Sequence, residues 1–408
     1  MDLEIKNFES FITPSLRPGQ RFVSYDCKKL LSPGENYGSV MLQVEAKISN
    51  HDGTEEIIHC VAKTCPPTDI LKQIFNTKVT FKREINVYRT LVPTLNKFGK
   101  ENGLEDIMNF FAVCLGGRIS LDPNSDTVDD DGILLLENLK VKGYDTVDRF
   151  SGFNLDCAEF LLKDLATLHA VPLAYRLKKP KEFDEKIRPH LKKAFSFKVS
   201  DDLQINAVKG LENMLAGESE CSEYIPKAVE AIMKLTSISI DNPPEERELF
   251  ATFTHNDFWV NNTMLRIENG KPVSNRMVDF QIIEYSSLAH DILFFLYSSV
   301  ELSVLENHVD DLLKYYYNQF IEILKKFSCD VSQFTFENYM EECKNIAIQE
   351  QLGHILIMLP GIMTLKEKAR ELSDIKETDM VSEKSSVHEN CLKKIKFTLL
   401  DFAKRGWL

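Results

Sequence analysis

Apolar and polar residues alternate over several segments in the first third of the chain, and this pattern predicts β-strands. Residues 37–48 and 55–64 alternate in part, carry Val and Ile, and each follow a turn-forming segment, PGENYG or SNHDG. Two linked antiparallel strands are therefore expected. Residues 109–120 and 132–139 give two further strand candidates, separated by the turn-rich segment DPNSDTVDDD.

Helical spacing of apolar residues occurs once within this strand-rich part and dominates after it. A helix is predicted over residues 70–91, and Pro93 is expected to close it. From Leu155 onward the apolar residues keep helical spacing. Long amphipathic stretches follow at residues 203–216, 222–237, 289–305, 307–327, 336–370 and 385–404.

This change of pattern predicts an α+β protein with two lobes. Residues 1–138 would form a small N-terminal lobe built on an antiparallel sheet, and residues 139–408 a larger helical lobe. The apolar run at 134–139, LLLENL, would connect them. A cleft between two lobes is a common place for a ligand.

Composition and charge narrow the class of protein. With 43% hydrophobic and 27% charged residues, the chain has the composition of a folded globular protein. A net charge of -13 and the lack of a basic tract argue against nucleic acid or an anionic membrane surface as a partner. The nine scattered cysteines contain no C-x-x-C pair, and no apolar run is long enough to span a bilayer. With no signal-peptide pattern at the N-terminus, a cytoplasmic protein with reduced thiols is expected.

The segment THNDFWVNN places several oxygen-bearing side chains between apolar stretches. Asp257 and Asn262 lie in it, and a predicted hairpin including the strand MVDFQII would bring Asp279 back towards them. Mg²⁺ prefers oxygen ligands and takes only one or two carboxylates, which suits Asn262 and Asp279. Asp257 would remain free to accept a hydroxyl proton. The alternative is that these residues only form turn and capping hydrogen bonds.

The N-terminal part adds charged residues in a compatible order. Lys63 lies in the strand VAKT, and Glu84 lies on the following helix. A lysine that contacts phosphates needs a carboxylate to hold its flexible side chain, and Glu84 could do this. Taken alone, such a pair is usually two solvated charges. The glycine turn GENYGS opens the first strand, where backbone amides could approach a phosphate.

In sequence order, the chain has a glycine turn, a strand lysine, a helix glutamate, a lobe connection, H-x-D-x-x-x-x-N and a strand aspartate. This order resembles the protein-kinase-like fold, in particular its small-molecule branch of choline and aminoglycoside kinases. The chain resembles the ecdysteroid-kinase-like (CHK-like) family over nearly its whole length. The motifs that carry this resemblance are GENYGSV, F-x-R-E-x-x-x-Y, LLLENL, HNDFWVNNTM, and VDFQ followed by HDILFFL.

The resemblance implies ATP and Mg²⁺ as cofactors and assigns roles to the charged residues. Asp257 would be the catalytic base, and Asn262 and Asp279 would hold Mg²⁺. Lys63 would contact the nucleotide phosphates and pair with Glu84.

Further residues would surround the nucleotide or support the loop. The connection between the lobes, with Glu137 and Leu139, would receive the adenine through backbone groups. His255 is expected to support the catalytic loop, and Asp291 to fasten it by hydrogen bonds, although Asp291 could instead be an exposed residue at a helix start. The turn covering the phosphates would comprise Gly34, Asn36, Tyr37, Gly38 and Ser39.

One position departs from the family pattern, because Asn256 stands where the family usually has Gly. Glycine tolerates backbone angles that most residues resist, and Asn is the next most tolerant residue. This substitution is the one local feature that favours an alternative function, a non-catalytic kinase-fold protein that binds a lipophilic ligand or nucleotide.

The substrate is expected to be a small hydroxylated molecule and not a protein. Residues 170–250 intervene before the catalytic loop and show helical patterns, and no A-P-E activation segment follows VDFQ. These inserted helices and the C-terminal segment GHILIMLPGIM would wall a pocket. Its apolar residues, Ile355, Ile357, Leu359 and Met363, suit a lipophilic alcohol better than choline, although core packing explains them equally well. A steroid alcohol is implied only by the resemblance.

Overall fold

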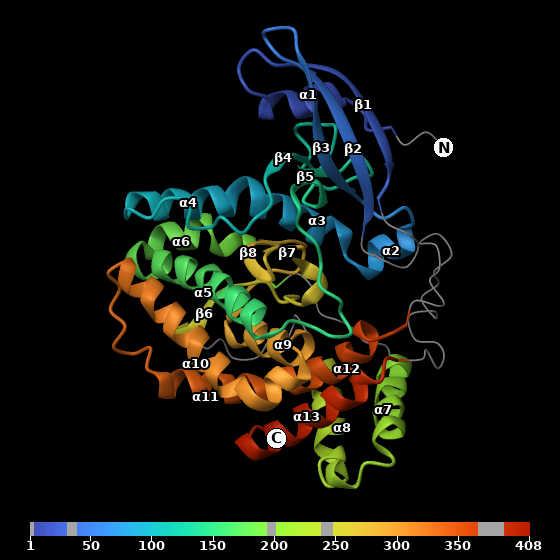
Figure 1. The fold of residues 1–408 in the computed structure, drawn as a ribbon, viewed down its shortest axis with the longest axis vertical. Helices are drawn as coiled ribbons and strands as arrows, with labels where there is room; N and C mark the ends of the chain where they lie inside the picture. The colour runs from blue at the N-terminus through green and yellow to red at the C-terminus, as the bar shows by residue number, and fades with distance from the viewer. Residues whose placement is uncertain (1–3, 31–38, 194–200, 238–247, 366–386) are drawn as a thin grey trace.

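The computed structural model describes residues 4–30, 39–193, 201–237, 248–365 and 387–408 (Figure 1). An antiparallel sheet occupies one end of the molecule, and a larger group of helices occupies the other. The predicted α+β architecture with a small sheet lobe and a larger helical lobe is confirmed.

The N-terminal sheet has five strands in the order β1-β2-β3-β5-β4. Side chains of β2 alternate between buried and partly exposed positions, so that one face of the sheet covers a small core with helix α1 (Phe8–Ile12). The predicted pairing of β2 with β3 is confirmed, and its register sets Lys63 opposite Met41. The strands are β1 (Arg21–Lys29), β2 (Val40–Ser49), β3 (Glu55–Thr64), β4 (Cys114–Arg118) and β5 (Ile133–Glu137).

The segment predicted as one helix over residues 70–91 is three connected elements. Helix α2 (Asp69–Ile74) ends before Asn76, whose φ of 44° is incompatible with a continuing α-helix. Helix α3 (Thr77–Asn86) then runs through a π-helical turn, η2 (Val87–Leu91), into α4 (Val92–Glu101).

The prediction that Pro93 closes this helix is wrong. Pro93 lies in the first turn of α4, where a missing N–H costs little. The preceding Val92 amide donates to the Val87 carbonyl, five residues back, so the π turn absorbs the change of hydrogen-bonding pattern. The chain thus continues as a helix to Glu101.

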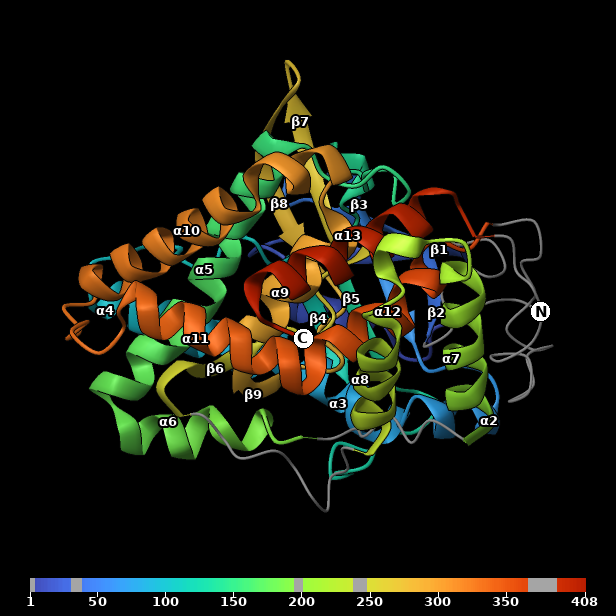
Figure 2. The same cartoon turned by 90° about the horizontal axis from the view of Figure 1, so that it is seen from below.

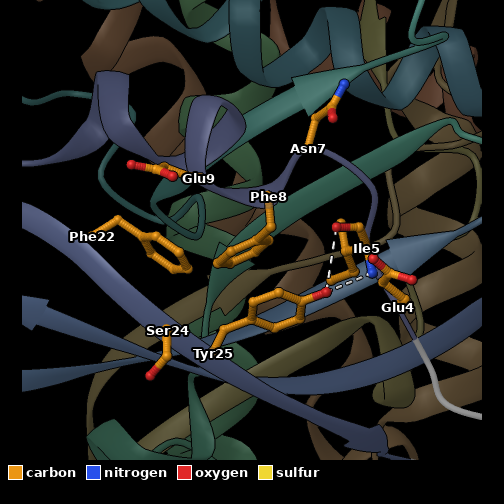
Figure 3. A pocket seen from close by; sticks show the side chains of 8 residues that line it. All are labelled: Glu4, Ile5, Asn7, Phe8, Glu9, Phe22, Ser24 and Tyr25. Carbon is orange, nitrogen blue, oxygen red and sulfur yellow. Dashed lines mark hydrogen bonds between the residues drawn. The ribbon is translucent and has the colours of Figure 1, made fainter.

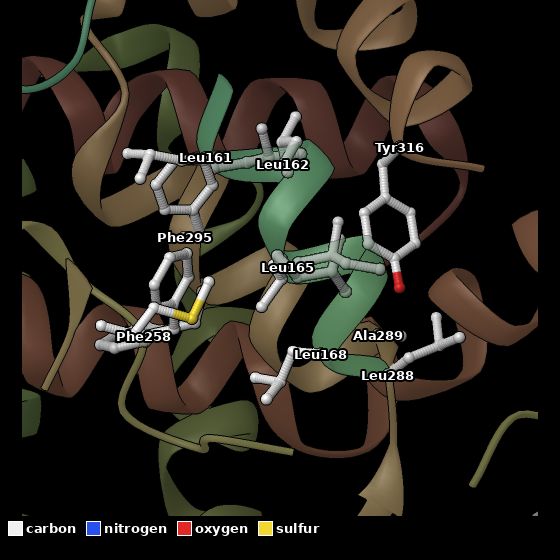
Figure 4. Close-up of a cluster of buried hydrophobic side chains, with 14 of the residues drawn as sticks. Leu161, Leu162, Leu165, Leu168, Phe258, Leu288, Ala289, Phe295 and Tyr316 are labelled. Carbon is white, nitrogen blue, oxygen red and sulfur yellow. The ribbon is translucent and has the colours of Figure 1, made fainter. Parts of the chain in front are cut away.

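The helical lobe is built around α9 (Ala289–Ser299), which is buried along almost its whole length. Figure 2 shows α9 near the centre, with α10, α11, α12 and α13 around it. Leucines of α5 (Leu155–Lys178) point into the same apolar cluster as Phe258 and Phe295 (Figure 4). The remaining helices are α6 (Pro180–Lys186), α7 (Asp201–Leu215), α8 (Ile225–Ser237), α10 (Leu302–Lys326), α11 (Phe336–Ile346), α12 (Leu352–Ile362) and α13 (Asn390–Arg405).

Two of the predicted long helical stretches are interrupted. Residues 289–305 divide between α9 and α10, because the chain is extended at Val300. The stretch that starts at 336 contains a second π-helical turn, η8 (Ala347–Gln351), and its predicted residues beyond 365 lie outside the described part of the chain. No helix in the described ranges combines the length and apolarity needed to cross a bilayer.

Helices of the region 170–250 pack against the C-terminal helices. A Cβ on Gly353 of α12 would lie 2.3 Å from the Ala231 carbonyl oxygen of α8, so the two helices touch through this glycine. Ile355, Leu359 and Met363 have no exposed surface. A residue that lines a water-filled or empty pocket keeps some accessible surface, so core packing accounts for these three.

A buried lysine holds the end of α9 against α13. Lys394 is 1% exposed, and its Nζ donates to the Ser298 carbonyl oxygen over 2.8 Å. Burial lowers the pKa of Lys394 from its ordinary 10.5 to about 7, since nearby Cys391 and Glu301 offset little of the desolvation.

This environment predicts a pH-dependent stability. Between the folded pKa near 7 and the unfolded pKa of 10.5, the unfolded chain binds more protons, so stability rises with pH. From pH 7 to 9 the free energy of unfolding should rise by about 2 kcal/mol more in the wild type than in Lys394→Met. Urea unfolding at both pH values measures the difference. Parallel pH profiles would show that folding does not lower the pKa of Lys394.

Candidate active site

Lys63 of β3 meets two carboxylates that come from different parts of the fold. Its Nζ lies 2.7 Å from Glu84 Oε2 of α3 and 2.7 Å from Asp279 Oδ1, which follows β8. Lys63 is 4% exposed and Glu84 1%. The sequence expectation that Glu84 holds Lys63 is matched by this geometry, and the alternative of two solvated charges is wrong.

The charges in this trio are unequal, with two carboxylates around one ammonium group. Burial lowers the pKa of Lys63, but Asp279 and Glu84 outweigh it, and the pKa stands above its usual value. Burial raises the pKa of Glu84 to about 7, against the opposing effect of Lys63. Lys63 therefore remains a cation at neutral pH.

The catalytic-loop candidates follow β6 (Ala251–Thr254), which pairs with β9 (Glu284–Ser287). Asn262 Nδ2 donates to both the backbone oxygen and Oδ2 of Asp257, each over 2.8 Å. Burial and, next, the charge of Asp279 raise the pKa of Asp257 well above its usual value, and hydrogen bonds from Asn262 and Trp259 oppose this. Asp257 is thus a stronger proton acceptor than an ordinary aspartate.

Two residues of the site have backbone angles that favour glycine. Asn256 has φ of 62° and Asp279 has φ of 65°. Asn and Asp are the side chains that adopt this left-handed region most readily, which fits the expectation for Asn256 in place of Gly. The Asn256 side chain also donates to the Ile282 carbonyl oxygen over 3.3 Å.

The conformation of Asp279 explains an error in the predicted hairpin. The hairpin consists of β7 (Thr263–Glu268) and β8 (Lys271–Met277), so the expected strand MVDFQII is wrong beyond Met277. A left-handed residue cannot continue a strand. The return towards the loop is still made, because the Val278 amide donates to the Asn262 carbonyl oxygen over 3.0 Å.

Asp291 on α9 holds the catalytic-loop candidates in place by hydrogen bonds. Its carboxylate accepts the amides of His255 over 2.6 Å and Asn256 over 2.7 Å. His169 Nε2 donates to it over 3.0 Å, and the Tyr316 hydroxyl lies 2.7 Å from His169 Nδ1. Burial would raise the pKa of Asp291, but these bonds, led by that of His169, hold it below its usual value. Asp291 is fully buried, so the alternative of an exposed helix-start residue is wrong.

His255 packs within the site and is buried. Its Nε2 donates to the Val278 carbonyl oxygen over 3.0 Å, and its ring contacts Phe258 and Phe280. Burial lowers the pKa of His255, so the ring is neutral. This position suits a supporting group that ties the loop to the segment carrying Asp279.

The lobe connection offers backbone groups but not the Glu137 side chain. The Glu137 carboxylate accepts the Val113 amide over 2.8 Å and pairs with Lys142. Within the described residues, the Leu139 amide donates no hydrogen bond, which makes it the candidate donor to a ligand in this connection. Glu137 therefore braces the connection, and the candidate ligand contact is Leu139.

The phosphate-covering turn is described only at its end. Ser39 is buried beside β2. The other expected members, Gly34, Asn36, Tyr37 and Gly38, lie outside the described residues.

The donor set fits Mg²⁺. Asn262 uses its nitrogen to hold Asp257, which leaves the Asn262 side-chain oxygen for a cation, and Asp279 has a second carboxylate oxygen besides the one that meets Lys63. Across the described ranges, no group of three or more His, Cys, Asp or Glu side chains forms a metal cage. Mg²⁺ commonly takes only one or two protein carboxylates and completes its shell with water and phosphate.

Three contributors to the site were not recognised in the sequence. His169 and Tyr316 support Asp291, and Arg83 contacts the segment after Asp279. A histidine and a tyrosine on apolar helix faces were the only local signals, and their partners are more than 100 residues away in sequence.

A separate hollow lies between the N-terminal segment and β1 (Figure 3). It is open, has a volume of about 380 Å³, and is lined by Phe8, Phe22 and Tyr25 among others. The Tyr25 hydroxyl accepts the Ile5 amide there over 2.8 Å. None of the candidate residues borders this hollow, so it is distinct from the site around Lys63 and Asp257.

Comparison with known proteins gives one family. A model of the ecdysteroid kinase-like family matches residues 33–329. A search of curated proteins gave no match. A solved structure of a mutant aminoglycoside 2'-phosphotransferase-IIIa with GDP has a TM-score of 0.41 at 10% identity, covering 99% of this chain and 97% of that one. The structure of APH(2")-IIia with GDP and kanamycin has a TM-score of 0.35 at 12% identity, covering 83% of this chain and 97% of that one.

Proposed function

Because the chain belongs to the ecdysteroid kinase-like family, we propose that it uses ATP and Mg²⁺ to phosphorylate a hydroxyl group of a small lipophilic alcohol, either ecdysteroid-like or xenobiotic. Small-molecule kinase activity follows from the family. The use of ATP and Mg²⁺ and the lipophilic alcohol as acceptor are what we propose beyond the family assignment.

The observation that carries the proposal is the contact of Lys63 with both Glu84 and Asp279. A buried ammonium fixed by carboxylates from two elements is suited to hold phosphate oxygens in a set position. In phosphoryl transfer most of the protein's contribution is positioning and charge stabilisation, so a rigid lysine is a functional requirement. The Leu139 amide is the proposed adenine contact at the other end of the nucleotide.

Asp257 is proposed to accept the proton of the acceptor hydroxyl. The two bonds from Asn262 fix its orientation, and its raised pKa favours proton uptake. Asn262 and Asp279 are the proposed Mg²⁺ ligands; bound Mg²⁺ supplies neutralisation of the phosphate charge. His255 and Asp291 keep the loop in place through bonds to Val278 and to two loop amides.

The proposed roles are assigned to the two lobes. Residues 1–138 would bind the nucleotide, residues 139–408 would carry the catalytic loop, and the helical insert at about 170–250 would border the acceptor. Because Ile355, Leu359 and Met363 are core residues, support for a lipophilic acceptor comes from the family description and not from these side chains. No protein or nucleic-acid substrate is proposed.

A transfer assay tests the function. Purified protein with labelled ATP and Mg²⁺ is offered a panel of hydroxylated steroids and xenobiotic alcohols, and phosphorylated products are identified by mass. The proposal expects at least one labelled alcohol whose formation requires Mg²⁺ and is lost in Asp257→Asn. Tight binding of a ligand or nucleotide without any labelled product would instead support the non-catalytic alternative.

A further inference from the structure

Arg83 crosses from α3 to the helical part of the chain. It is 7% exposed, its Nη1 donates to the Ile283 carbonyl oxygen over 2.6 Å, and its Nη2 donates to the Lys192 carbonyl oxygen. Helix α3 lies just below the sheet, next to the helical lobe (Figure 1). One side chain therefore joins this helix to two segments that are distant in sequence.

The first of these segments begins at Asp279. Glu84, the neighbour of Arg83, accepts the Phe280 amide and meets Lys63, while Arg83 contacts Ile283 a few residues further on. Adjacent residues of α3 thus bind the two ends of residues 280–283. Movement of that segment would displace both Glu84 and Lys63.

The second segment, residues 187–193, lies in the region proposed to border the acceptor. It follows α6, and Arg83 bonds to its Lys192 carbonyl oxygen. The Tyr285 amide of β9 also donates to the Leu191 carbonyl oxygen over 2.8 Å. Residues 187–193 are therefore held against both α3 and the segment that follows Asp279.

The chemistry of arginine makes this link geometrically strict. A buried guanidinium is costly unless its N–H groups are bonded, and charge-assisted bonds are stronger than neutral ones. Its planar fork fixes the relative position of its two acceptors, which a flexible lysine would not do. If residues 187–193 shift, α3 must shift with them or Arg83 must lose a buried bond.

We propose that Arg83 is a positioning residue that couples residues 187–193 to Glu84, so that nucleotide binding and docking of this acceptor-side segment favour each other. The proposal rests on the function proposed above. Such coupling is reciprocal, because each event must change the other's affinity by the same factor. An acceptor that orders residues 187–193 would therefore tighten nucleotide binding.

The first test uses the wild-type protein and follows amide hydrogen exchange with and without MgADP. Slower exchange over residues 187–193 when MgADP is present is the expected result. In Arg83→Lys, which keeps the charge but loses the fork, this protection should disappear. Unchanged exchange over residues 187–193 in the wild type would overturn the proposal, even if no variant folds.

The second test is a double-mutant cycle on MgADP affinity, measured by calorimetry. Arg83→Met should weaken MgADP about tenfold. In a Glu84→Gln background the same change should cost only about twofold, because residues that act through one another are not additive. Equal losses in both backgrounds would overturn the coupling. Retained circular dichroism and melting temperature show that each variant folds.

A matched control lies on the same continuous helix. Arg89 is exposed, and its Nη1 donates to the Gly117 carbonyl oxygen over 2.7 Å, within the N-terminal sheet region. Arg89→Met should leave MgADP affinity unchanged, and a loss equal to that of Arg83→Met would overturn the proposal. If the wild type does not bind MgADP, the proposed function fails and this inference with it. If the wild type binds MgADP normally but the losses caused by Arg83→Met and Glu84→Gln are additive, only the proposed coupling through Arg83 fails.

Discussion

Replacing Asp257 by Asn should lower kcat for phosphate transfer by about a thousandfold while MgADP affinity changes by less than about threefold. Asn keeps the shape of the side chain and can still accept the Asn262 bond, but it cannot take up the hydroxyl proton. The loss should therefore fall on kcat and leave nucleotide binding intact. Single-turnover transfer of labelled phosphate and calorimetry with MgADP measure the two quantities separately.

The control for this experiment is Asp330→Asn. Asp330 is exposed and accepts the Ser332 amide in a local turn, so the substitution makes the same chemical change outside the site. Its kcat should equal that of the wild type. If Asp257→Asn turned over at a rate within about threefold of the wild type, Asp257 would not be the base.

The largest expected loss of stability comes from Asp291→Ala. The carboxylate is fully buried and accepts three hydrogen bonds, from the amides of His255 and Asn256 and from His169. Its removal leaves these three donors, two of them buried and the Asn256 amide partly buried, without an acceptor, and the free energy of unfolding should fall by about 3–5 kcal/mol. Urea unfolding measures this, and hydrogen exchange should show faster exchange at the His255 and Asn256 amides.

Tyr316→Phe provides the comparison. It removes only the hydroxyl that meets His169 Nδ1, so its cost should be about 1 kcal/mol, and the loop amides should keep their protection. A contradictory result would be equal destabilisation by Asp291→Ala and Tyr316→Phe with unchanged amide exchange in the catalytic loop. Asp291 would then support only the buried hydrogen bonds with His169 and Tyr316, and the loop would not depend on it.

Elements with a clear local pattern of apolar and polar residues could be predicted from the sequence. The hairpin of β2 and β3 followed from alternating Val and Ile between turn segments, because one face of these strands is buried. Strand β1 lacked such a signal, since it is an edge strand with mostly exposed side chains. The π turn at Val87–Leu91 was also invisible, because apolar spacing does not distinguish it from an α-helix.

The residues of the candidate site also include some with a sequence signal and some without one. Lys63, Glu84 and Asp279 were found by their order along the chain, and the structure places the Glu84 and Asp279 carboxylates each 2.7 Å from Lys63 Nζ. His169 is joined to Asp291 across 122 residues, and no local pattern specifies such a partner. Glu137 was expected to receive the adenine through backbone groups, and the contacts of its side chain with Lys142 and the Val113 amide were not anticipated, because only three-dimensional packing decides them.

The attachment of α13 bears on where an expression boundary can be placed. The family match ends at residue 329, yet Lys394 caps the end of α9 through Ser298, and the adjacent Ser299 hydroxyl accepts the Val260 amide of the catalytic loop over 3.0 Å. A fragment cut at the end of the family match would uncover the apolar side of α9 and leave that loop without its support. The smallest fragment worth producing therefore includes the C-terminal helix.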